Sequence, residues 1–79
     1  MVLTAKQWSY IQKGFHLTPR QVQVAKLICA GLDNDQIADR CHIEYNTART
    51  HVRDICRRLS VHGRAGLLLK LIKLAKTPR

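Results

Sequence analysis

The chain has 79 residues and a formal net charge of +9, from 14 lysines and arginines against five acidic residues. A chain of this length makes one small domain that buries only about 60% of the surface its unfolded form exposes, and its charge favours a polyanionic partner or an acidic membrane surface. Apolar runs such as Leu67 to Leu69 are too short to span a membrane, and residues 1–16 lack the apolar run of a secretory signal.

The first 16 residues predict a helix of their own. Thr4 and Gln7 have the spacing of a capping box, in which each side chain binds the other residue's backbone amide. Trp8 and Ile11 then share one helical face, and Gly14 is expected to end the helix. We predict an N-terminal helical extension that docks its aromatic side chains on the core, the alternative being a loose arm.

Two further helices are expected before the middle of the chain. Thr18 opens a second capping box, with Pro19 at the first helical position, where its missing N–H costs nothing. Gly31 is expected to stop this helix. Asp33 caps a third helix, which a short turn through residues 42–43 connects to the next one.

The fourth expected helix has two opposite faces. Its apolar face consists of Ala48, Val52, Ile55 and Leu59. Its other face consists of hydrogen-bond donors, namely Asn46, Arg49, Thr50, Arg53 and Arg57. Glu44 is a poor cap, so we expect the helix to begin at Asn46, and to end near Ser60. Arginines at this density suit phosphates and guanine edges.

The last expected helix runs from about Arg64 to Lys76, after a tight connection at Gly63, and the tail 77–79 is expected to fray. Its apolar side chains cover well over a third of its circumference, whereas packing on a core needs a stripe of only about 100°. The surplus predicts an exposed apolar patch that a second copy of the chain covers. The alternative is that the N-terminal helix covers it within one chain.

Charge is distributed unevenly along the sequence. Four of the five acidic residues lie between residues 33 and 44, whereas residues 47–64 hold five arginines against Asp54 alone. This asymmetry indicates an oriented basic surface. Two helices joined by a few residues, the second rich in donors, are typical of a helix-turn-helix, whose second helix enters the major groove of DNA. Acidic residues on the preceding helix fit this layout, because that helix should be held away from the DNA phosphates.

Several blocks of sequence carry a more specific resemblance. They are Leu17-Thr18-Pro19-Arg20, Ala30-Gly31-Leu32-Asp33-Asn34, Gln36-Ile37-Ala38, Thr47-Ala48-Arg49-Thr50-His51-Val52, and Leu59-Ser60-Val61 with Arg64. In this order and spacing they resemble the LuxR-type helix-turn-helix domain over about residues 17 to 72. The resemblance implies an all-α fold, a four-helix DNA-binding domain at residues 17–76 that usually dimerises through its last helix. To this we add the short N-terminal helix at residues 1–16.

The resemblance also implies functional residues. Base and backbone contacts are expected from Arg49, Thr50 and Arg53, and Thr47 is expected to bind phosphate or cap the helix. His51 either contacts phosphate or braces the helix. The full DNA-binding set that we predict is Arg20, Thr47, Arg49, Thr50, His51, Arg53 and Arg57. The predicted dimer interface is Leu68, Leu71, Ile72 and Ala75. Leu71, like Leu67, stands where the family usually has alanine.

These features predict a cytoplasmic transcriptional regulator that binds double-stranded DNA as a homodimer on an inverted repeat, with RNA polymerase as a further partner. Two alternatives stay open: a domain like region four of sigma factors, and a protein-binding module that sequesters another regulator. We expect no enzyme and no cofactor, because no residues have catalytic spacing and no glycine-rich phosphate loop is present. A membrane-surface peptide built on the basic last helix is not expected, because that helix lies inside the domain pattern.

The cysteines, Cys29, Cys41 and Cys56, are odd in number and show no CxxC spacing. Each falls on or beside an apolar stripe, where a free cysteine behaves as a small hydrophobic residue. A reduced intracellular protein follows from this pattern. The remaining alternative is zinc held by Cys41 and His42 with some combination of Cys56, His51 and His62; we expect no metal.

Overall fold

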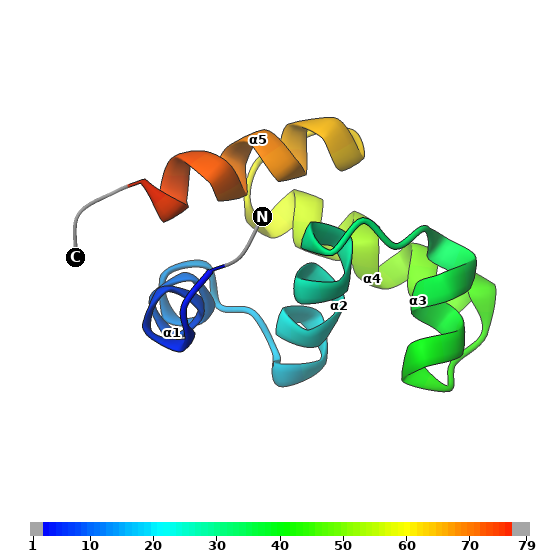
Figure 1. Cartoon of the computed structure of the whole chain (residues 1–79). Coiled ribbons are helices and arrows are strands. Elements are labelled where there is room, and N and C mark those ends of the chain that lie inside the picture. The colour runs from blue at the N-terminus through cyan, green and yellow to red at the C-terminus, as the bar shows by residue number, and fades with distance from the viewer. Residues whose placement is uncertain (1–2, 77–79) are drawn as a thin grey trace.

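The computed structural model of the chain describes residues 3–76, and all regular secondary structure in that range is helical. Five helices follow one another: α1 (Ala5–Phe15), α2 (Pro19–Cys29), α3 (Asn34–Cys41), α4 (Tyr45–Arg58) and α5 (Gly63–Ala75). The predicted all-α class with an additional N-terminal helix is confirmed. Figure 1 shows α3 and α4 at one end of the molecule and α1 at the other, with α2 between them and α5 running alongside.

The first three helices begin as the sequence predicts. At α1, the Thr4 amide donates to Gln7 Oε1 at 2.7 Å, and the Gln7 amide donates to Thr4 Oγ1 at 3.1 Å. The same reciprocal pair of hydrogen bonds starts α2 at Thr18 and α3 at Asp33. These bonds satisfy amides that have no partner inside the helix, and they fix where each helix enters the fold.

Some of the helix ends in the structure differ from the predicted ones. Gly14 does not end α1 but lies within it, and the chain reverses at His16, which has a φ of 57°. Residues His42 and Ser60, beyond the ends of α3 and α4, also have positive φ values, of 55° and 58°. Gly31 does stop α2 as predicted, with a φ of 90°. The reversals after α1, α3 and α4 therefore use side chains that tolerate the left-handed conformation less well than glycine does.

The expected boundaries of the last two helices shift by one or two residues. The first turn of α4 starts at Tyr45 rather than Asn46, although the Glu44 side chain makes no capping hydrogen bond. This helix ends at Arg58 rather than near Ser60, because Ser60 already has the left-handed conformation. The final helix begins at Gly63 itself and ends at Ala75. The predicted frayed tail, 77–79, lies outside the described residues.

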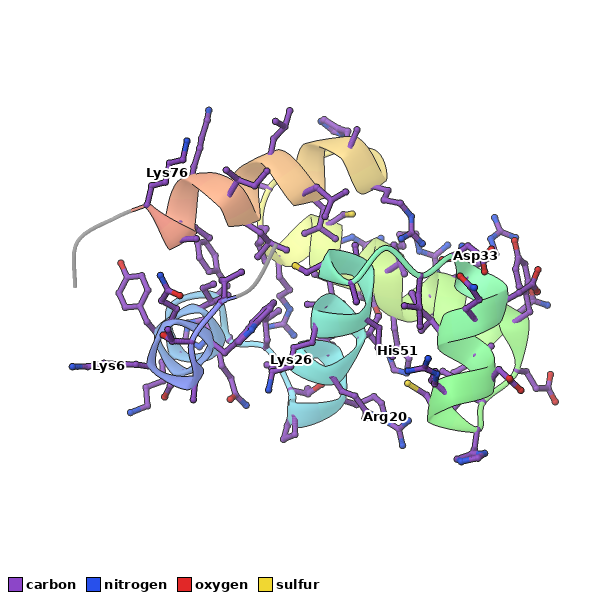
Figure 2. The ribbon with its side chains drawn as sticks, in the orientation of Figure 1. Lys6, Arg20, Lys26, Asp33, His51 and Lys76 are labelled. Carbon is purple, nitrogen blue, oxygen red and sulfur yellow. The ribbon has the colours of Figure 1, made fainter. Side chains whose placement is uncertain are left out.

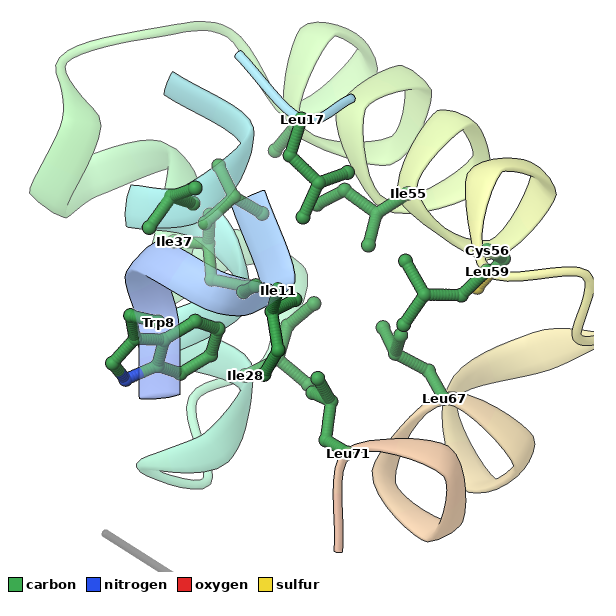
Figure 3. Close-up of a cluster of buried hydrophobic side chains, with 14 of the residues drawn as sticks. Trp8, Ile11, Leu17, Ile28, Ile37, Ile55, Cys56, Leu59, Leu67 and Leu71 are labelled. Carbon is green, nitrogen blue, oxygen red and sulfur yellow. The ribbon is translucent and has the colours of Figure 1, made fainter. Parts of the chain in front are cut away.

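The core is formed by side chains from all five helices, and α1 is part of it (Figure 3). Trp8 is 6% exposed and Ile11 is 1% exposed, and they belong to the same buried cluster as Leu67 and Leu71 of α5. The N-terminal helix is thus docked rather than a loose arm. It covers the inner side of α5 but not the whole predicted patch, because Leu69 and Ile72 remain exposed.

No helix among residues 3–76 is long and apolar enough to cross a membrane.

Candidate nucleic-acid interface

The two predicted faces of α4 are both present in the structure. Ala48 and Ile55 are completely buried, and they anchor the helix against the core. The five donor residues on the opposite face are all exposed, namely Asn46, Arg49, Thr50, Arg53 and Arg57. The packing of the apolar face therefore holds a row of polar side chains toward solvent along most of the helix.

Four of these donors surround a shallow hollow of about 270 Å³, namely Asn46, Arg49, Thr50 and Arg53. The Thr50 hydroxyl donates to the Asn46 carbonyl at 3.0 Å, within the helix. The hydroxyl proton of Thr50 is therefore used within the helix, and the side chain offers a partner only an acceptor lone pair and a methyl group. The two guanidinium groups on either side retain donors for a partner with acceptor oxygens or nitrogens.

The remaining predicted site residues lie in different environments. Thr47 is exposed in the first turn of α4, whereas His51 is half-buried at the edge between the two faces. Arg20 is exposed on α2, and its Nη1 donates to the Cys41 carbonyl at 3.0 Å. That bond ties α2 to the last turn of α3, so Arg20 has a bracing role in addition to any contact with a partner (Figure 2).

Two arginines that sequence reasoning left out of the site hold the helices together. Arg64 Nη1 donates to the Leu32 carbonyl at 2.7 Å, and Nη2 donates to Asn34 Oδ1 at 2.8 Å. Arg58 Nη1 donates to the His16 carbonyl at 3.0 Å, which ties the end of α4 to the turn after α1. Their carbonyl acceptors belong to turns distant in sequence, so no local pattern could have identified these partners.

Negative charge lies on a different side of this end of the molecule. Asp35 and Asp39 of α3 line a hollow of about 560 Å³ that also includes His42 and Tyr45. The arginines that face outward from α4 do not line this hollow. The basic surface is therefore oriented, as the charge pattern of the sequence indicates, and its acidic neighbour disfavours a polyanion on the α3 side.

The cysteines are free thiols in the structure, with Cys41 and Cys56 buried and Cys29 half-buried. Burial raises the pKa of the Cys56 thiol, although its hydrogen bond to the Gly63 carbonyl and the charge of Arg64 act in the opposite direction. Burial also raises the pKa of Cys29. Within the described range, no three histidine, cysteine or acidic side chains gather as metal ligands, so nothing supports the zinc alternative.

The last helix presents an apolar outer face, in part different from the predicted one. Leu71 is completely buried in the core, so its side chain is not exposed to a second chain. Ile72 is 36% exposed, and Leu68 and Ala75 are half-buried. Leu69, which the prediction omitted, is 62% exposed and is the most exposed large hydrophobic side chain described. Helical phase alone did not reveal which leucines of α5 the core covers.

Comparison with known proteins supports a regulatory domain. The family described as bacterial regulatory proteins, luxR family, matches residues 16–71. The resemblance inferred from the sequence blocks is therefore confirmed. The match begins at the turn before α2 and ends within α5, so α1 lies outside it. No solved structure matches the chain significantly.

Curated relatives share this region. A nitrate/nitrite response regulator protein homolog of Haemophilus influenzae is 42% identical over 48 residues, which cover 61% of this chain and 23% of the relative. The two-component response regulator PprB of Pseudomonas aeruginosa is 42% identical over 55 residues, 70% of this chain and 20% of that protein. The HTH-type transcriptional regulator MalT of Yersinia pestis is 36% identical over 63 residues, 80% of this chain and 7% of that protein. The chain thus spans less than a quarter of these relatives.

Proposed function

The chain belongs to the luxR family of bacterial regulatory proteins, and on this premise we propose that it binds specific sites on double-stranded DNA and regulates transcription. The recognition helix is α4, which lies in the major groove. The observation that carries the proposal is the exposed row of Asn46, Arg49, Thr50 and Arg53 around one shallow hollow. Ala48 and Ile55, on the opposite face, are completely buried. A rigid helix with its donors held outward is what direct reading of base edges requires.

The chemistry of this row assigns a task to each side chain. Arg49 and Arg53 can each donate two hydrogen bonds to O6 and N7 of a guanine, and the Asn46 amide suits adenine. Thr50 presents its methyl group to thymine, because its hydroxyl proton is bonded to the Asn46 carbonyl. These contacts select the sequence of the site.

Phosphate contacts at the borders of the helix supply affinity without sequence preference. Thr47 reaches a phosphate from the first turn of α4, and Arg57 reaches one from the last turn. His51 and Arg20 contribute at the side of α2. Arg20 keeps its bond to the Cys41 carbonyl while its remaining donors face the partner.

The protein binds DNA as a symmetric dimer in the bacterial cytoplasm, and RNA polymerase is the further partner of the bound regulator. The outer face of α5 forms the contact, with Leu69 and Ile72 at its centre and Leu68 and Ala75 at its margin. In one copy of the chain Leu69 and Ile72 are exposed, whereas Leu68 and Ala75 are half-buried. A second copy removes this apolar surface from water. Two-fold symmetry would place two recognition helices roughly 34–36 Å apart, and therefore favours an inverted repeat.

Selection of bound fragments from a random duplex library tests the proposal. We expect one recovered motif, composed of two inverted half-sites whose centres are about one helical turn apart. Recovery of no enriched motif, with the protein folded and retaining duplex, would show that it binds DNA only non-specifically. Retention of no duplex at low salt would remove the DNA-binding function itself.

A further inference from the structure

A second hollow, separate from the one over the bases, lies at the C-terminal end of α4. Its volume is about 470 Å³. It is lined by Arg53, Cys56, Arg57, Ser60, Val61 and His62. Ser60 and His62 belong to the connection between α4 and α5, and neither is among the residues predicted from the sequence to contact DNA. Both are exposed.

The backbone around this hollow is firmly held. The Val61 amide donates to the Cys56 carbonyl at 2.9 Å, which closes the turn after α4 while Ser60 has its positive φ. The Cys56 thiol donates to the Gly63 carbonyl at 3.6 Å and fixes the start of α5. The side chains of Ser60 and His62 therefore extend from a fixed turn, which lowers the conformational cost of binding there.

The lining chemistry suits a phosphate group. Arg53 and Arg57 provide guanidinium donors, Ser60 provides a hydroxyl and His62 an imidazole, and none of the described residues that line the hollow is acidic. The His62 side chain makes no capping bond to α5 and is therefore not used for that purpose. Arginine, hydroxyl and imidazole donors in one concavity are the usual partners of phosphate oxygens.

The position of the hollow relates it to DNA. Arg53 lines both hollows, so the second one continues the base-reading row toward the end of the helix. With 14 residues, α4 is about 21 Å long, whereas the major groove is about 12 Å wide. A helix of this length that crosses the groove with Arg49 over the bases extends past the groove, and its C-terminal end meets the sugar-phosphate backbone.

We propose that this hollow binds one backbone phosphate of the DNA, with Ser60 and His62 as its specific donors beside Arg57. The inference rests on the proposed function, which it deepens by naming a contact outside the recognition row. This contact does not read bases. It fixes the position of α4 in the groove, and so keeps Arg49 and Arg53 in register with their base pairs.

Binding of a random duplex to His62→Glu and to Ser60→Gly tests the proposal. The carboxylate repels the phosphate, and we expect an affinity loss of about tenfold for His62→Glu. Ser60→Gly removes the hydroxyl while glycine keeps the positive φ, and we expect a loss of about two- to threefold. The control is Lys6→Glu on α1, which changes the net charge more than His62→Glu does, and we expect it to change affinity less than twofold. Figure 2 shows Lys6 projecting from α1 away from the rest of the chain.

A second measurement locates the phosphate. In a duplex recovered by selection, a single methylphosphonate at the contacted position should weaken wild-type binding but not that of His62→Glu. Circular dichroism and melting verify that each variant is folded.

The outcomes separate this inference from the proposed function. If wild type binds duplex but His62→Glu and Ser60→Gly bind as Lys6→Glu does, the phosphate site is wrong and the DNA-binding function stands. If inorganic phosphate at matched ionic strength raises the melting temperature of wild type while His62→Glu keeps wild-type DNA affinity, the hollow holds a free anion and the proposal is again wrong. If wild type binds no duplex, both proposals fail together.

Discussion

The Gln7 Nε2 atom donates a 2.8 Å hydrogen bond to the backbone carbonyl of Ala75, joining the first helix to the last across 68 positions of sequence. Ala75 ends α5, so this bond satisfies a carbonyl that has no partner within its own helix. The Lys70 ammonium lies 5.8 Å from the Phe15 ring and reinforces the same contact. The N-terminal helix, which lies outside the family match, is therefore a structural part of this domain.

Replacing Trp8 tests the contribution of α1 to stability. Trp8 is 6% exposed, with the Lys26 ammonium 6.0 Å from its ring. We expect Trp8→Ala to lower the free energy of unfolding by about 3 kcal/mol, because a large cavity opens in a small core. The exposed Lys13→Ala serves as the control and should change little. In wild type, the Trp8 emission maximum should be blue-shifted; an emission maximum equal to that of the denatured chain would show that α1 is not docked.

The positive φ of His42 predicts a stabilising substitution. A side chain in the left-handed conformation costs about 1 kcal/mol relative to glycine, and His42 has a φ of 55°. His42→Gly should therefore increase the free energy of unfolding by about this amount in urea titrations. His62 has a φ of −115°, so His62→Gly should give no gain. Equal effects of the two substitutions would mean that the turn after α3 does not have this conformation in solution.

Replacing Arg53 by lysine separates base reading from simple attraction. The lysine keeps the charge but loses the planar fork that binds guanine with two bonds. We expect Arg53→Lys to lose roughly 1–3 kcal/mol of binding free energy on the selected duplex and little on a random duplex. Competition titrations with both duplexes measure the difference. An equal loss on the two would assign Arg53 to phosphate alone.

Charged residues on the outer face of α5 test the dimer. Leu69 is 62% exposed and Ile72 is 36% exposed, so their replacement by glutamate should leave the monomer folded. In the double variant Leu69→Glu and Ile72→Glu, we expect the steep dependence of binding on protein concentration to disappear on an inverted repeat, while a single half-site is still bound. Unchanged concentration dependence would place the dimer contact elsewhere.

Local patterns predicted the start of each of the first three helices, because a capping box involves residues only three positions apart. The two faces of α4 followed from helical periodicity in the same way. The left-handed turns at His16 and Ser60 were not predicted, because neither residue has glycine's freedom, although local backbone hydrogen bonds close both turns. The burial of Leu71 and the exposure of Leu69 depend on how α5 packs against the rest of the core, and neighbouring positions in one helix gave no means to distinguish them.

The long-range hydrogen bonds of the arginines also could not be predicted from the sequence. Arg58 and Arg64 bind backbone carbonyls 42 and 32 positions away, so in the sequence they are indistinguishable from residues that face DNA. Of the donors predicted for α4, those on its outer face do face solvent, because their exposure follows directly from the buried positions opposite them.

The central claim, that the exposed face of α4 binds duplex DNA through its charged groups, is tested most directly by the salt dependence of binding. Fluorescence anisotropy of a labelled duplex gives the association constant at a series of salt concentrations. Each phosphate neutralised contributes a slope of roughly −0.9 in log K against log salt, so three contacts alone give about −2.7. We expect a slope at least this steep, reduced by about one contact's worth in Arg57→Ala. A slope near zero, or no binding at low salt, would contradict the account.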